Sequence, residues 1–144
     1  LESLAAAILQ HDVAGILNAI AEFDQTGKDL ERVLLDLVIH LRHVLVQAYS
    51  PQGDLLKELP DVQAAVIREQ AEWIDPSRVS ALMEKLMAAS EQLKYSLSKR
   101  THLETTLISA ARTAHFATLD EVWAQVERLK SGLPAEEPEP EKKK

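Results

Sequence analysis

Apolar residues recur every three or four positions along most of the chain, which is the spacing of one face of an α-helix. The best-marked case follows Asp75 and Pro76. An Asp side chain can accept from the free N–H groups of a first helical turn, and Pro needs no N–H at the first helical position. Residues 75–104 therefore predict an amphipathic helix, a basic joint and the start of another helix. The expected apolar stripe comprises Val79, Leu82, Met83, Leu86, Met87, Ala89, Leu93 and Leu97.

The same period predicts helices before this stretch. Leu1 already lies in a helical stripe, so we expect the sequence to continue a longer protein. Asp12 caps a second helix, which ends near Gly27, a residue that can adopt the left-handed conformation common at helix ends. Asp29 opens the most apolar helix, to about residue 48, in which Leu35, Ile39 and Val46 widen the apolar face. Its only solvent-exposed face is expected to be a stripe of Arg32, Asp36, His40, His43 and Gln47.

Helices also follow the loop that Pro51, Gly53 and Pro60 indicate. Residues 61–74 predict a helix with Val62, Ala65, Val66 and Trp73 inward, and small apolar residues line another helix at 103–114. Thr118 and Glu121 have the spacing of a capping box, in which two side chains satisfy backbone donors reciprocally. The helix that follows carries Leu119, Val122, Trp123, Val126 and Leu129 on one face. An acidic, Pro-rich tail at 132–144 is expected to be disordered.

Composition narrows the fold class. The 144 residues are 46% hydrophobic, with four Gly, two Trp, two Tyr and two Phe. Strands favour aromatic and β-branched residues, so this Leu- and Ala-rich composition favours helices. We predict an all-α, compact bundle of about six to seven helices.

Charge and cysteine content exclude several function classes. The formal charge is -7, from 16 basic and 23 acidic residues, whereas sequence-independent DNA binding needs concentrated Lys and Arg. Without Cys there is no disulfide framework and no thiolate zinc site. No apolar run is long enough to span a membrane. We expect a cytoplasmic protein that contacts neither nucleic acid nor membrane directly.

No catalytic or cofactor motif stands out. His40 and His43 have a spacing that could present two imidazoles to a metal, but no Glu-x-x-His or His-Glu-x-x-His pattern supplies further ligands. Gly27 and Lys28 lack the rest of a phosphate-binding loop. We therefore predict no catalytic residue, no cofactor and no metal site. The alternative, an enzyme with a di-metal site inside the bundle, would require bound metal.

The basic joint near residue 99 has two interpretations. Lys94, Lys99 and Arg100 could contact an anion, or could interact favourably with the dipole at a helix end. Glu104 also has two roles open to it: with Thr101 as cap it closes a capping box, and with Ser98 as cap it can pair with Arg100 one turn earlier. In either case we expect Asp75, Pro76, Arg100 and Glu104 to be structural residues.

The order of these features resembles a known family. A helix that starts at Ile74-Asp75-Pro76 and ends in Glu91-Gln92-Leu93-Lys94-Tyr95-Ser96 is followed by Lys99-Arg100 and Leu103-Glu104-Thr105-Thr106-Leu107. This arrangement resembles the C-terminal helical domain of the bacterial DNA polymerase III gamma/tau subunit. The resemblance covers about residues 1–114. It predicts a collar-like domain at 1–116. The additional helix expected at 117–131 and the tail at 132–144 depart from the family pattern.

The resemblance implies a clamp loader, which uses ATP to place a sliding clamp on primed DNA. It implies that this domain is a non-catalytic oligomerisation collar, whose partners are other gamma/tau copies, delta and delta-prime. ATP, Mg²⁺ and Zn²⁺ would bind only in upstream domains, and polymerase and helicase would bind through regions beyond residue 144.

Two hypotheses follow for what the domain contacts. For the collar we expect the contact face to be the small-residue surface of Leu107, Ala110, Ala111 and Ala114, because small side chains let a neighbouring helix approach closely. The alternative is a stand-alone helical adaptor that binds a partner peptide or helix in a groove.

Overall fold

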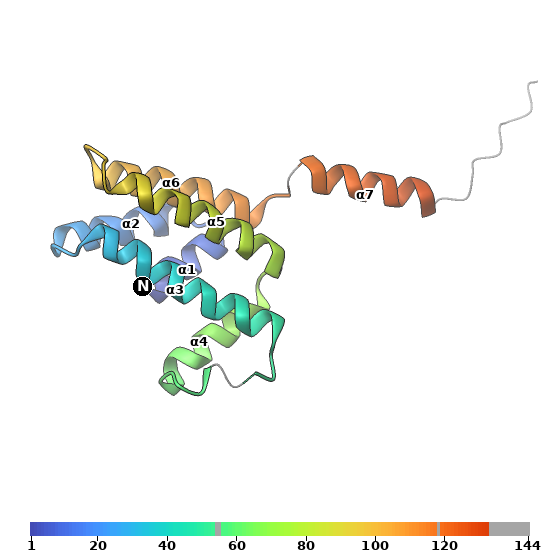
Figure 1. Cartoon of the computed structure of the whole chain (residues 1–144), viewed down its shortest axis with the longest axis horizontal. Helices are drawn as coiled ribbons and strands as arrows, with labels where there is room; N and C mark the ends of the chain where they lie inside the picture. The colour runs from blue at the N-terminus through green and yellow to red at the C-terminus, as the bar shows by residue number, and fades with distance from the viewer. Residues whose placement is uncertain (54–55, 118, 133–144) are drawn as a thin grey trace, which may run out of the picture.

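The chain forms seven α-helices in the computed structural model, which describes residues 1–53, 56–117 and 119–132 (Figure 1). No strand occurs in these ranges, so the predicted all-α class is confirmed. The helices are α1 (Glu2–Leu9), α2 (Val13–Gln25), α3 (Leu30–Tyr49), α4 (Asp61–Glu72), α5 (Pro76–Leu93), α6 (Lys99–His115) and α7 (Leu119–Gly132).

Local capping sets the helix boundaries that the sequence predicted. Asp12 Oδ1 accepts from the Gly15 backbone N–H at 2.9 Å, which starts α2, and Asp29 Oδ1 accepts from Glu31 N–H at 2.9 Å, which starts α3. Between them Gly27 has φ +71°, and Lys28 N–H donates back to the Phe23 carbonyl at 2.9 Å. The reversal from α2 into α3 is thus fixed by a left-handed glycine, as predicted.

Five helices enclose the main core. α5 packs against both α6 and α3, while α1 and α2 pack against each other and against α6 (Figure 1). Leucine and isoleucine side chains without solvent-accessible surface fill the space between them; they include Leu4, Ile8, Ile16, Ile20, Leu37, Leu41, Leu82, Leu86 and Leu107. α4 covers the end of α3 with a smaller cluster of Val44, Leu56, Ala64 and Ile67.

The inward face of α4 differs from the prediction. Val62 is 75% exposed and Ala65 is also exposed, whereas Ala64, Ile67 and Gln70 are buried. The predicted face was therefore wrong by a rotation of the helix about its axis. Contact with α3 sets the rotation, because the Gln70 side chain hydrogen-bonds inside the protein to a side chain of that helix.

Further burial predictions for α3 and α5 were wrong. On α3, His40 is buried while Leu35 and Ile39 are about half exposed, so the predicted polar stripe is not the helix's only solvent-exposed face. Leu97 is fully exposed because α5 ends at Leu93, before the predicted stripe is complete, and Met87 also lies largely in solvent.

α7 extends away from the bundle and buries none of its residues (Figure 1). It is the additional helix predicted at 117–131. Thr118, the first residue of the expected capping box, and positions 133–144 of the expected tail lie outside the described residues. Among the helices described, none is long and apolar enough to cross a membrane.

Candidate interaction surfaces

The start of α5 is built as its sequence indicates. Asp75 Oδ1 accepts from the Ser77 backbone N–H at 2.9 Å and from the Ser77 hydroxyl at 2.6 Å, and Pro76 occupies the first turn. The Ser77 side-chain and backbone hydrogen bonds hold the pKa of Asp75 below its usual value. Asp75 and Pro76 therefore start α5.

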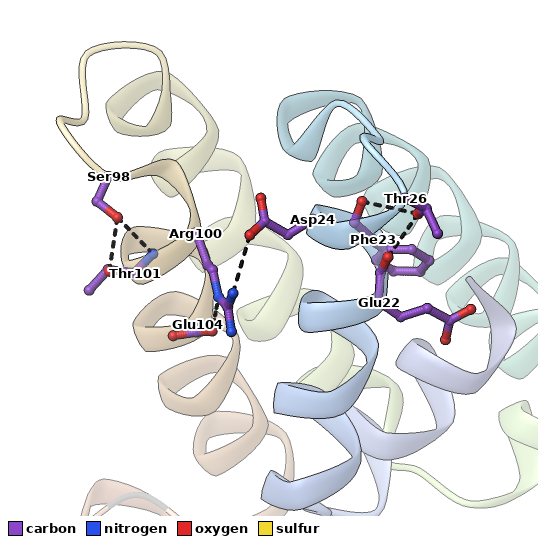
Figure 2. A network of polar contacts seen from close by, with 8 residues as sticks. All are labelled: Glu22, Phe23, Asp24, Thr26, Ser98, Arg100, Thr101 and Glu104. Atoms are coloured by element: carbon purple, nitrogen blue, oxygen red, sulfur yellow. Dashed lines mark hydrogen bonds and ion pairs between the residues drawn. The ribbon is translucent and has the colours of Figure 1, made fainter.

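The start of α6 resolves the two roles open to Glu104. Ser98 is the cap, since its Oγ accepts from the Thr101 backbone N–H at 3.3 Å and donates to Thr101 Oγ1 at 2.9 Å. Glu104 therefore lies one turn inside the helix, where its Oε1 accepts from Arg100 Nε at 2.9 Å. The pairing at four residues' separation occurs, and the capping box on Thr101 does not (Figure 2).

The basic joint ties three helices together. Arg100 Nη1 reaches Asp24 Oδ2 near the end of α2 at 3.2 Å, and Lys99 Nζ reaches Glu31 Oε1 in the first turn of α3 at 2.6 Å. Figure 2 shows Arg100 between Asp24 and Glu104. Hydrogen bonds to these carboxylates raise the pKa of both cations: Glu31 acts on Lys99, and Glu104 followed by Asp24 acts on Arg100. We call this group of ion pairs the clasp; its members are Asp24, Glu31, Lys99, Arg100 and Glu104.

The clasp accounts for Lys99 and Arg100, whereas the helix-dipole interpretation holds only for Lys94. Lys99 and Arg100 are the first two residues of α6, where the helix dipole disfavours cations, so the dipole cannot account for them. Their partner carboxylates offset that cost. Lys94 is different because it follows the last residue of α5, where a cation is favourable, and it pairs with Glu91 at 3.2 Å.

The two histidines of α3 have different environments. His40 is buried, and its Nε2 lies 2.7 Å from Gln70 Oε1, while Gln70 Nε2 donates to the Glu2 carbonyl at 3.3 Å. Burial, followed by the nearby Arg42 and His40, lowers the pKa of His43. Both histidines line an open hollow of about 680 Å³ between α1, α3 and α4. Over the described residues, no three His, Cys, Asp or Glu side chains gather as metal ligands.

The four residues expected to form the contact face lie inside the bundle. Leu107, Ala110 and Ala111 have no accessible surface, and Ala114 is also buried. Their small side chains do permit close helix approach, but the helices that approach α6 are α5, α2, α1 and α3 of the same chain. Another protein could reach them only by opening the core.

Exposed apolar side chains are concentrated on α7. The predicted stripe of this helix is present, yet no part of the described chain covers it: Trp123 is 63% exposed, and the other members are Leu119, Val122, Val126 and Leu129. The pattern correctly predicted an amphipathic helix. It carried no signal that the apolar face would be left without an intramolecular partner.

Contacts of Arg78 with the turn between α6 and α7 and with Glu121 hold α7 through the polar side of that helix. Arg78 of α5 donates to the His115 carbonyl at 2.8 Å and lies 3.8 Å from the Glu121 carboxylate. Phe116 packs edge-on against both His11 and His115, which stack on each other at 5.5 Å. Sequence reasoning missed this cluster because His11, with φ +57°, lies in a turn that has no helical period.

Comparison with known proteins gives two findings. Residues 1–126 match the family model described as domain III of the DNA polymerase III subunits gamma and tau. The chain is also 24% identical, over 154 aligned positions, to DNA polymerase III subunit tau of Bacillus subtilis strain 168. That alignment covers 96% of this chain but only 27% of the length of the Bacillus protein.

Proposed function

Because the chain belongs to the domain III family of the DNA polymerase III gamma and tau subunits, we propose that it is a non-catalytic oligomerisation domain, the collar of a clamp loader. In this proposal it joins gamma or tau copies to one another and to delta and delta-prime subunits in the bacterial cytoplasm. ATP, Mg²⁺ and Zn²⁺ bind to other domains of the full-length protein, and this domain contributes no catalytic group and no contact with DNA.

One observation carries this proposal: the bundle has a complete core and still displays a continuous apolar helix face. The core helices bury their large side chains without help from α7, whose five stripe residues remain in solvent. Contiguous exposed apolar surface on a folded domain marks an interaction site, because leaving it in water is unfavourable.

The electrostatics support protein contacts rather than nucleic-acid contacts. The chain carries a formal charge of -7, and the cations of the basic joint pair with carboxylates of the same chain. A groove that binds phosphates would need several cations available to displace counterions.

Sedimentation velocity tests the proposal on the chain alone and mixed with purified delta-type and delta-prime-type subunits. We expect faster sedimentation as the concentration of the chain rises, or a mixed species with the other subunits. A chain that remains monomeric up to about 1 mM, a concentration that reveals even millimolar dissociation constants, and that binds neither partner would overturn the collar assignment. Full-length tau is the positive control for the partner subunits.

A further inference from the structure

The exposed face of α7 points away from its own bundle. Glu121, Ala124, Gln125 and Arg128 of α7 line a shallow hollow together with Arg78 and other residues at the start of α5. These are residues of the polar side of α7, opposite the stripe that contains Trp123. The ion pair with Arg78 therefore turns the apolar face outward, toward other molecules.

A groove that is apolar, like the exposed face of α7, runs between α5 and α6 on the outside of the bundle. It encloses about 370 Å³, and its walls are mostly short side chains, among them Ala88, Thr105, Thr106 and Ser109. Short side chains on two adjacent helices let a third helix settle between them. The lining contains one cation, Lys85, and no carboxylate.

The length and charge of this groove fit α7. Along α6 the groove lining runs from His102 to Ser109, seven helical steps or about 10 Å. Four of the five stripe residues of α7 also span seven steps, from Val122 to Leu129. Lys85 lies at one end, where its Nζ donates to Thr113 Oγ1 at 3.2 Å, and exposed Arg112 follows Ser109 by one turn.

These charges select one orientation. α7 is acidic in its first turn, at Asp120 and Glu121, and basic in its last turn, at Lys130. Glu121 pairs with Arg78 of its own chain, so Asp120 is the acidic residue left for a contact in the groove. Opposite charges meet when Asp120 lies near Lys85 and Arg112, and α7 then runs antiparallel to α6. In this orientation Trp123 lies over Ser109, and Val126 lies over Thr106.

We propose that α7 of one copy docks in the α5–α6 groove of a second copy of this chain. The inference rests on the proposed oligomerisation function and assigns it a surface. A helix-into-groove contact joins two different surfaces, so each pair of copies keeps one free helix and one free groove. Further copies can add in the same way until the assembly closes on itself.

Paired variants of the full 144-residue chain test this arrangement. Trp123→Asp places a charge on the helix, and Ala88→Arg fills the groove at a position that is exposed in the monomer. We expect each variant alone to self-associate at least about tenfold more weakly than the unmodified chain by sedimentation velocity. A 1:1 mixture should form dimers and nothing larger, because only one intact helix and one intact groove remain. Val62→Asp, an exposed apolar position on α4, is the matched control and should associate normally.

Several results would overturn the docking model. If Ala88→Arg associates normally while Trp123→Asp does not, α7 contacts a surface other than this groove. If both variants associate as the unmodified chain does, neither surface is used, although the collar function stands. If the unmodified chain neither self-associates nor binds delta-type subunits, both the docking model and the proposed function fail.

Cross-linking separates docking between chains from folding back within one chain. The chain has no Cys, so Thr106→Cys in one copy and Val126→Cys in a copy of different mass report their proximity without background. We expect an oxidised heterodimer between the two, and none when Val62→Cys replaces Thr106→Cys. A chain carrying both cysteines that cross-links only internally, even when concentrated, would show docking in cis and overturn the proposal.

Discussion

Replacing Leu107 by Ala tests whether α6 stabilises the chain from within or contacts a partner. Leu107 has no accessible surface and belongs to the main core cluster, with Ala110 and Ala111 on the same helix. Truncating a fully buried Leu typically costs about 2–5 kcal/mol, because the transfer free energy is lost and a cavity remains. Small neighbours on α6 leave little side-chain volume to refill the space, so we expect about 3 kcal/mol or more.

Urea unfolding followed by circular dichroism measures this loss. With a slope of about 1.5 kcal/mol per molar urea, a loss of about 3 kcal/mol lowers the unfolding midpoint by about 2 M. The control is Val62→Ala, at an exposed position, whose effect should stay within about 0.5 kcal/mol. Self-association of folded Leu107→Ala should match that of the unmodified chain. An unchanged midpoint together with weakened association would refute the core assignment and restore Leu107 as a contact residue.

Three further predictions concern polar contacts. Arg100→Met breaks the ion pair with Asp24, so it should lower the midpoint of thermal unfolding at low salt and less at 1 M NaCl, where a Debye length of about 3 Å screens exposed pairs; an effect independent of salt would contradict this. Asp75→Asn keeps a good cap but removes a carboxylate whose folded-state pKa is lowered. The unmodified chain should therefore lose more stability than the variant as the pH falls below about 4. Equal losses in thermal melts recorded at several pH values would exclude this contribution. Gln70→Ala leaves His40 buried without its partner and should cost about 1–3 kcal/mol in urea unfolding, whereas Gln70→Leu combined with His40→Leu should recover much of the loss.

Helix starts were predictable because their causes are local. Asp12, Asp29 and Asp75 each precede a helical apolar period, and each accepts a hydrogen bond from a backbone N–H two or three residues later. Such a contact depends on the chain within one turn, so the sequence displays it directly. The same holds for the reversal at Gly27, where the required backbone conformation favours glycine.

Helix faces were less predictable because neighbouring helices decide them. On α4, the spacing of Val62 and Ala65 is as helical as that of Ala64 and Ile67. The second pair is buried because α4 meets α3 on that side, next to the hydrogen bond between Gln70 and a buried histidine. Periodicity reports that a helix has an apolar face, but the rotation depends on contacts distant in sequence.

The burial of the four residues predicted as the contact face was missed for a related reason. Small residues on α6 and large apolar residues on α7 both indicate packing, but a packed neighbour in the same chain and one in another chain require the same residue types. The structure separates the two cases through burial: the small-residue face of α6 is buried within the bundle, whereas α7 buries none of its residues. Sequence reasoning therefore found both apolar surfaces but could not tell which of them is buried within the chain.

Salt should act differently on the ion pairs at the two ends of α6 and on the docking of α7, because different forces operate in the two cases. The clasp at its beginning consists of partly exposed ion pairs, and the ion pair between Arg78 and Glu121 beyond its end is also partly exposed and 3.8 Å long. Such pairs contribute little each and are screened by salt. Burial of the α7 stripe in a groove would not be screened, since it removes apolar surface from water. High salt therefore weakens the ion pair that orients α7 on its own bundle, but it leaves the apolar contribution to docking intact. Self-association should then persist at salt concentrations that weaken the clasp.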